Sequence, residues 1–313
     1  MTCSDKPQSY VQALKALAHR IAVLTGCGLA GYGLVACGDD SSSDDYSDAA
    51  IPDAMDSSTA EVSVQFQALV GGEPFACGSS YDGIGTSSST VQPNDFRLYI
   101  HDVRLLDSEG NEVPLTLTQD DAFQYQDLVL LDFEDGTATC SGGNSAVNPQ
   151  AVGTVPAGEY SGIRFVLGVP FELNHANAAT APSPLNVTSL FWNWQGGYKF
   201  ARFDGPAGDL PEWRFHLGST GCDGDTTGTV PTTTCTNGNR AEVELTNFDP
   251  TSTPISADLG ALLEGVDLTE DTNGPPGCMS GPKDLECENY FSNLGLSFNG
   301  STPGPQSFFS VSN

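Results

Sequence analysis

Two tryptophans one residue apart stand out among the residues of this chain that can do chemistry. Trp192 and Trp194 lie in an aromatic stretch, residues 191–200, that is typical of a strand. Because side chains alternate along a strand, the two indoles are predicted to project from one face while Asn193 points away from it. Such a pair of large, easily oxidised indoles points to redox or metal chemistry.

Methionine is scarce, and one methionine stands where it can act as a ligand. The chain has 3 methionines; Met1 and Met55 precede the predicted folded domain, which leaves Met279. It lies in a Gly/Pro-rich loop beside Cys278, a poor setting for the usual core role of methionine. A thioether combined with imidazole selects copper, above all Cu(I), over zinc or calcium. Copper is therefore the predicted metal.

Three histidines lie in the predicted domain, and each is a candidate metal ligand. His101 ends a predicted strand that begins at Phe96, and His175 lies in a polar loop. His216 lies within a strand, on the face opposite to Trp213. For each of them the alternative is a histidine that is merely hydrogen bonded within the structure. Their separation in the chain leaves the ligand unassigned.

The first 36 residues are typical of an export signal. A basic N-terminal segment is followed by a Gly-rich apolar run, residues 21–36, that is shorter than a membrane-spanning helix normally needs. Residues 34–37 resemble a bacterial lipobox, so Cys37 is the predicted lipid anchor; an ordinary signal peptide with an incidental cysteine is the alternative. The Asp/Ser-rich residues 37–58 predict a disordered tether. We expect a lipid-anchored protein on the periplasmic or cell-surface side of a bacterial membrane.

The remaining cysteines are predicted to form disulfides. Of 9 cysteines, two leave with the signal and Cys37 takes the lipid, so six remain in an oxidising compartment. None has the CxxC-type spacing of a zinc or iron–sulfur site. Proximity in the sequence favours the pairs Cys77–Cys140, Cys222–Cys235 and Cys278–Cys287.

The composition argues against nucleic acid as a partner. The chain has 11 Lys and Arg against 40 Asp and Glu, a formal net charge of −29. Such a surface repels polyanions. No phosphate-binding loop, basic aromatic patch or GxSxG elbow occurs, and residues 222–226 resemble only part of a calcium loop. Enzymatic activity has no positive support, and a copper oxidoreductase is the least favoured interpretation.

Residues 59–313 are predicted to form one domain. Alternating apolar residues indicate strands, among them residues 62–68, 96–101 and 241–245. Helical spacing is clearest in Leu259, Leu262, Leu263 and Val266, with Ser256 as the expected N-cap. We expect a mainly β fold, a single antiparallel β-sandwich-like domain with long disulfide-stapled loops and one short helix.

Several motifs follow one another along the chain: residues 96–103, 168–171 with 174–175, 192–194 with 197–200, 216–222 and 277–282. Taken in this order, they resemble the MbnP family, also described as metallo-mystery pair four-Cys motif proteins and found beside methanobactin operons. The four cysteines of the family name correspond to Cys222, Cys235, Cys278 and Cys287.

The resemblance implies a periplasmic copper-binding protein that favours Cu(I). It further implies that a dihaem c-type enzyme of the MauG and cytochrome c peroxidase superfamily oxidises Trp192 to kynurenine. The implied ligands are a histidine, Met279 and the kynurenine or its surroundings, with His175 and His216 favoured and His101 third. Trp194 would support the site.

A function from another class stays open. Trp192 and Trp194, if they share a face, would also suit a carbohydrate-binding or adhesive β-sandwich surface lipoprotein that stacks sugars on its indoles. Copper content and oxidation of Trp192 in the native protein separate the two interpretations.

Overall fold

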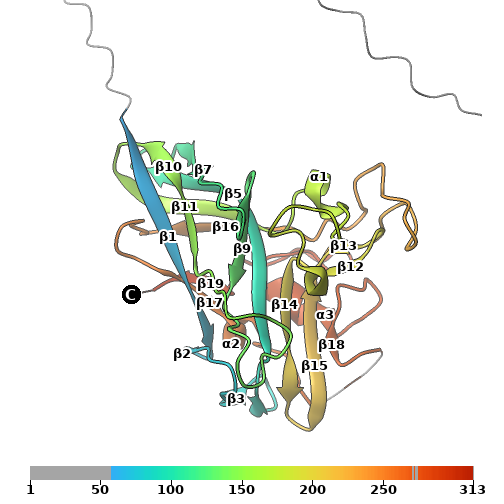
Figure 1. Cartoon of the computed structure of the whole chain (residues 1–313). Helices are drawn as coiled ribbons and strands as arrows, with labels where there is room; N and C mark the ends of the chain where they lie inside the picture. Colours follow the sequence, from blue (N-terminus) through green and yellow to red (C-terminus); the bar gives the residue numbers. More distant parts are fainter. Residues whose placement is uncertain (1–57, 270, 272–273, 313) are drawn as a thin grey trace, which may run out of the picture. The chain divides into compact units, whose positions relative to one another are not determined.

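The computed structural model of the chain describes residues 58–269, 271 and 274–312 (Figure 1). The predicted export signal, Cys37 and all of the predicted tether except Ser58 lie outside the described residues. Within the described part, no helix is long and apolar enough to cross a membrane.

Most of the described strands belong to one 11-stranded sheet. Its main path runs β16-β11-β5-β14-β15-β18, and all of its pairings are antiparallel except β15 with β18. The strands of this sheet are β3 (Tyr81–Ile84), β4 (Ser89–Val91), β5 (Asp95–Asp107), β6 (Glu112–Pro114), β8 (Gln124–Tyr125), β9 (Leu128–Asp132), β11 (Tyr160–Leu167), β14 (Ala201–Ala207), β15 (Leu210–Leu217), β16 (Ala241–Thr246) and β18 (Gly277–Cys278).

A 6-stranded sheet follows the order β19-β17-β1-β10-β7, with β2 paired to β1. Here β1 and β17 are parallel. The strands are β1 (Thr59–Val70), β2 (Glu73–Pro74), β7 (Thr116–Leu117), β10 (Gln150–Pro156), β17 (Ile255–Asp258) and β19 (Phe309–Val311). A separate pair is formed by β12 (Phe191–Asn193) and β13 (Gly197–Tyr198).

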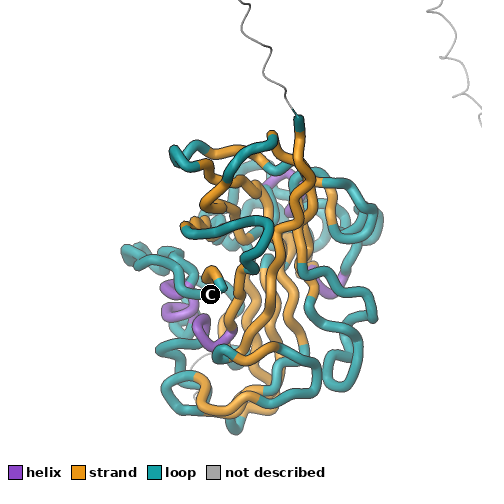
Figure 2. The backbone as a smooth tube through the Cα atoms, turned by 90° about the vertical axis from the view of Figure 1, so that its left-hand side faces the viewer, coloured by secondary structure: helices purple, strands orange, loops and turns teal. Residues whose placement is uncertain are grey.

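The two main sheets share an apolar core. Alternate residues of β1 are buried, as the period of 2 in its sequence predicts. The rings of Phe66 in β1 and Phe165 in β11 are edge-on, with their centroids 5.7 Å apart. The rings of Phe165 and Phe309 in β19 are also edge-on, with a centroid distance of 5.0 Å. Figure 2 shows the strands side by side, with much of the loop backbone around them. The expected mainly β, sandwich-like fold is confirmed.

Helices are few and short in the described residues: α1 (Phe171–Asn174), η1 (Thr188–Leu190), α2 (Leu259–Leu262) and α3 (Cys287–Asn293). The expected helix is α2, but its predicted N-cap is wrong. Ser256 belongs to β17 and pairs with its neighbours, while the Asp258 carboxylate accepts the Gly260 N–H at 2.8 Å. The carboxylate therefore caps the helix one residue before it starts.

The three disulfides have the pairing expected from proximity: Cys77–Cys140, Cys222–Cys235 and Cys278–Cys287. The Cys222–Cys235 disulfide joins residues 13 positions apart in the segment after β15. The Cys278–Cys287 disulfide joins residues 9 positions apart, starting from the end of β18. Met279 lies in the loop closed by Cys278–Cys287, and the loop closed by Cys222–Cys235 comes shortly after His216 in the chain.

Candidate metal centre

The tryptophan motif lies on the small β12–β13 hairpin, which Figure 1 shows beside the ends of β14 and β15. β12 ends at Asn193, whose side chain accepts the Gly196 N–H at 2.8 Å and closes a turn over residues 194–196. Trp194 thus lies in the turn, with its ring 6.2 Å from that of Phe191. Phe191 and Trp192 are consecutive in the strand and face opposite ways. The predicted common face for Trp192 and Trp194 is therefore wrong, because the strand alternation stops at Asn193.

Two glycines make room for the Trp192 indole. A Cβ on Gly218 would lie 2.4 Å from Cζ3 of Trp192, and one on Gly196 would lie 3.3 Å from Cε3. The indole nitrogen Nε1 is buried and has no hydrogen-bond partner. An unpaired buried N–H costs about 1–3 kcal/mol, so this polar atom is an exception that needs a reason.

His216 lies beside this indole, near the end of β15. The two ring centroids are 6.4 Å apart, and the His216 side chain is buried. Its Nε2 is 2.7 Å from Oδ1 of Asp204, while its Nδ1 is buried without a partner. Burial lowers the pKa of His216 and outweighs the Asp204 carboxylate, which raises it. The ring is therefore neutral at pH 7, the form in which imidazole binds metals.

The parallel pairing of β18 with β15 positions Met279 near the end of β15. β18 pairs with β15 in the register Phe215 to Cys278, and Met279 is the next residue. Ser280 then ties the segment down: its hydroxyl accepts the Gly218 N–H at 3.0 Å and donates to the His216 carbonyl at 3.0 Å. The methionine is held next to the end of β15.

Trp192 and Met279 line one cavity of about 410 Å³. Its remaining lining residues are Asn193, Gln195, Gly196, Ser219, Thr220, Gly221 and Cys222. His216 is not among the lining residues, but its ring lies beside that of Trp192, so three of the residues singled out in the sequence lie around the Trp192 side chain. They supply an indole, an imidazole nitrogen and a thioether within one region.

His175 has both of its ring nitrogens engaged. It follows α1, with Nδ1 at 3.1 Å from the Trp194 carbonyl and Nε2 at 3.2 Å from the Asn174 amide nitrogen. Nδ1 must donate to the carbonyl, so Nε2 accepts from the amide. These contacts connect the WxW turn to α1 and engage both ring nitrogens of His175, whereas Nδ1 of His216 has no partner.

Geometry alone would make a metal cluster of His175, Cys222 and Cys235, whose ligand atoms lie within 4.8 Å of one another. The two cysteines are bonded to each other, however. A thiolate is the sulfur species that binds metals, and a disulfide does not provide one. The covalent bond therefore outweighs the proximity.

His101 lies in a different setting. The prediction that His101 ends its strand is wrong. β5 continues to Asp107, with Asp102 at a positive φ of 52°. Burial, and then the nearby Arg240 guanidinium, lower the pKa of His101 to about 4. Its Nε2 is buried and unpartnered. A neighbouring cation opposes binding of a second one at His101.

Known proteins that are similar to this chain identify its family. The sequence profile of MbnP matches residues 59–280. The chain belongs to the MbnP family. A solved structure of MbnP from Methylosinus trichosporium is similar, with 33% identity, a TM-score of 0.71, and coverage of 81% of this chain and 98% of that one. No match was found among curated proteins.

Sequence reasoning missed the residues that hold the centre of this MbnP-family chain. Asp204, Gly218 and Ser280 each act through a contact with a segment distant in the sequence. Gly218 and Ser280 were within recognised motifs, but nothing in their spacing showed what they contact. Asp204 was in no motif.

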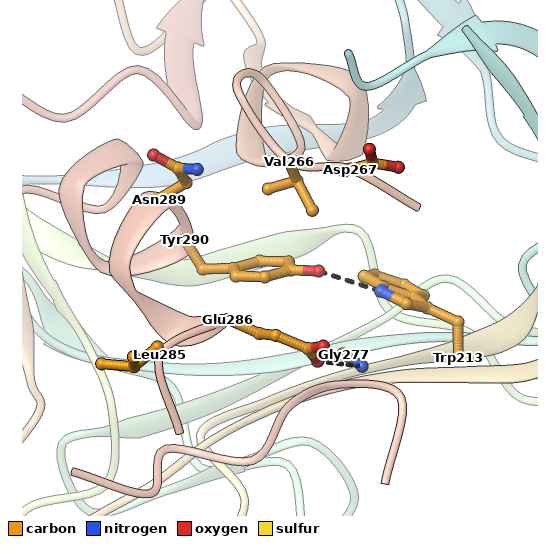
Figure 3. A pocket seen from close by; sticks show the side chains of 8 residues that line it. All are labelled: Trp213, Val266, Asp267, Gly277, Leu285, Glu286, Asn289 and Tyr290. Carbon is orange, nitrogen blue, oxygen red and sulfur yellow. Dashed lines mark hydrogen bonds between the residues drawn. The ribbon is translucent and has the colours of Figure 1, made fainter. Parts of the chain in front are cut away.

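A second cavity, of about 200 Å³, surrounds the third tryptophan of this MbnP-family chain (Figure 3). The Trp213 indole N–H donates to the Tyr290 hydroxyl at 2.9 Å, and the two rings are stacked. The other lining residues are Val266, Asp267, Gly277, Leu285, Glu286 and Asn289. None of them is a histidine or a methionine, and the Trp213 N–H is satisfied, unlike that of Trp192.

Proposed function

We propose that this chain is an exported lipoprotein, anchored through Cys37, that binds one copper ion as Cu(I) beside Trp192. The observation that carries the proposal is the meeting of Trp192, His216 and Met279, with two buried nitrogens left unpartnered. Family membership supports it. The role is binding in copper homeostasis, and no catalytic activity is proposed for the chain itself.

The residues present fit copper. Met279 offers a thioether and His216 a neutral imidazole nitrogen, and soft or borderline donors of this kind suit Cu(I). When bound, the ion would occupy the region where Nδ1 of His216 lacks a partner. We assign His216 and Met279 as ligands, and place His175 and His101 outside the ligand set.

Trp192 is proposed to be a precursor. Oxidation to kynurenine cleaves the C2–C3 bond of the indole, and hydrolysis then releases C2 as formate, which leaves C3 as a ketone and the ring nitrogen as an arylamine. The nitrogen concerned is the one that is buried without a partner in the unmodified side chain. We propose a dihaem c-type enzyme of the MauG and cytochrome c peroxidase class as the catalyst, with two equivalents of a peroxide as the terminal oxidant, and Trp194 as support for the turn that carries Trp192.

Copper content and peptide mass measured on protein from the native host test this function. We expect Trp192 to have the mass of kynurenine and the protein to contain about one copper. Met279→Ala and His216→Ala should lose most of the copper. His101→Ala is the matched control, since it removes a half-buried imidazole that lies beside Arg240. Unmodified Trp192 in copper-free native protein would overturn the proposal, and copper lost only in His175→Ala would reassign the histidine.

The carbohydrate-binding alternative has lost its main support. It required the two indoles of the WxW motif on one face, whereas Trp194 lies in the turn against Phe191. No other observation on the described residues favours a sugar platform.

A further inference from the structure

The carboxylate of Asp204 engages one specific nitrogen of His216. Its Oδ1 is 2.7 Å from Nε2, and both side chains are buried. An ionised carboxylate only accepts hydrogen bonds, so Nε2 must carry the proton of the neutral ring. Nδ1 is then left with a lone pair, and this is the nitrogen that is buried without a partner.

The carboxylate itself is held in place. Its other oxygen, Oδ2, accepts from Nε of Arg202 at 2.7 Å and forms an ion pair with Nη2 of Arg202, also at 2.7 Å. Arg202 also pairs with Asp95, whose oxygen lies 3.2 Å from its Nε. Because Arg202 is the cross-strand partner of His216 in the β14–β15 register, the whole group sits on paired backbone. Both oxygens of Asp204 are thus occupied, which opposes its rotation.

We propose that Asp204 is a positioning residue that fixes the His216 tautomer, so that copper is bound through Nδ1 and not through Nε2. The inference rests on the proposed function for the identity of the metal. It follows the general design in which a metal-binding histidine donates its other N–H to a carboxylate. Neither Asp204 nor the choice of nitrogen is apparent from the motifs of the sequence.

Nitrogen-15 NMR of the histidine side chains in metal-free wild-type protein tests the role of Asp204 directly. We expect His216 as a neutral ring protonated at Nε2 at pH 7. Asp204→Asn should change this pattern, because the Asn amide can donate to Nε2 and shift the proton to Nδ1. A wild-type ring protonated at Nδ1 would overturn the inference, and this measurement needs neither copper nor a variant that folds.

Competition titration with Cu(I), on protein purified from the native host, tests the consequence for the metal. We expect Asp204→Asn to weaken binding by roughly 10–100-fold, the usual effect of removing such a partner. Asp204→Glu, which restores a carboxylate, should recover part of the affinity.

Asp132→Asn is the matched control, because it replaces another buried carboxylate, one that accepts from the Glu134 N–H and contacts neither Arg202 nor His216. It should bind copper as the wild type does. An Asp132→Asn variant as weak as Asp204→Asn, or an Asp204→Asn variant with unchanged affinity, would overturn the positioning role. Wild-type protein that binds no copper would contradict the proposed function instead, and the NMR result would still decide what Asp204 does to His216.

Discussion

Trp192 differs from the other two tryptophans in the state of its indole nitrogen. Its N–H is buried and unpartnered, whereas that of Trp213 donates to Tyr290, and Trp194 is half-buried in a turn. A fold does not normally leave such an atom unpaired, since replacing the indole by an apolar side chain would avoid the cost. The proposed oxidation of Trp192 would remove this cost, because it converts the same nitrogen into an arylamine.

Gly218→Ala tests the fit of this indole. The added methyl group would lie 2.4 Å from the Trp192 ring, so either the indole or the strand end must move. Overpacking of this kind destabilises by roughly 1–3 kcal/mol. We expect lower stability in urea and a shifted Trp fluorescence spectrum. Gly142→Ala, which meets nothing within 4 Å, is the control; equal effects from both variants would contradict the interpretation.

His101 predicts an acid sensitivity of folding. Its pKa is about 4 in the native state against 6.5 for the ordinary group, so the unfolded chain takes up a proton first as the pH falls. The stability from this group is complete above pH 6.5 and is lost as the pH falls toward 4. The difference amounts to about 3 kcal/mol. Urea denaturation should show that His101→Gln loses less stability than wild type between pH 7 and 4, and parallel profiles would refute this.

At the scale of elements, the centre depends on β18, a strand of only two residues. β18 brings Met279 to the end of β15, and Ser280 secures it through two hydrogen bonds although its φ is +61°. A non-glycine residue at positive φ is unfavourable, and it persists where the surrounding contacts enforce it. The Cys278–Cys287 disulfide closes the loop that contains Met279 and Ser280.

Ser280→Ala tests how much the hydrogen bonds of the Ser280 hydroxyl contribute to holding β18 against β15. Loss of the hydroxyl leaves the Gly218 N–H without its partner in a buried place, at a cost of about 1–3 kcal/mol. We expect reduced copper content together with reduced stability, measured by metal analysis and by denaturation. Ser292→Ala, an exposed serine of α3, is the control. Full copper content in Ser280→Ala would show that Ser280 does not position Met279.

At the scale of the whole molecule, two sheets of very different size enclose one core while the surface is strongly acidic. Against 40 acidic residues stand 11 basic ones, and several of the basic ones are held in ion pairs. Arg97 is buried against Asp95, for example, and this pairing helps raise its pKa although burial opposes it. Most of the acidic side chains on the surface therefore repel one another.

Thermal unfolding at rising salt checks the balance of these charges. We expect the Tm to rise between about 0.02 and 0.5 M sodium chloride, because screening weakens the repulsion more than it weakens buried pairs. A gain of about 1 kcal/mol would correspond to roughly 2–4 °C for a domain of this size. Chloride is preferred to sulfate, which also strengthens apolar burial. A falling Tm would mean that exposed ion pairs dominate.

Local sequence patterns were sufficient for the fold class, the disulfides and the family. Alternation along β1 reports burial on one face, and cysteines close in sequence pair readily. The limits of these patterns are visible at Trp194, where a turn ended the alternation, and at Ser256, where a strand took the place of a cap.

The sequence by itself determined that an oxidisable tryptophan, a lone methionine and three histidines were the groups to consider. Only the tertiary structure distinguishes the surroundings of the three histidines. His175 spends both nitrogens on its neighbours, His101 lies beside Arg240, and His216 keeps one nitrogen free next to Trp192. The physical reason is that hydrogen-bond partners and strand register join residues far apart in the chain, such as Met279 and the end of β15, and no local pattern records them.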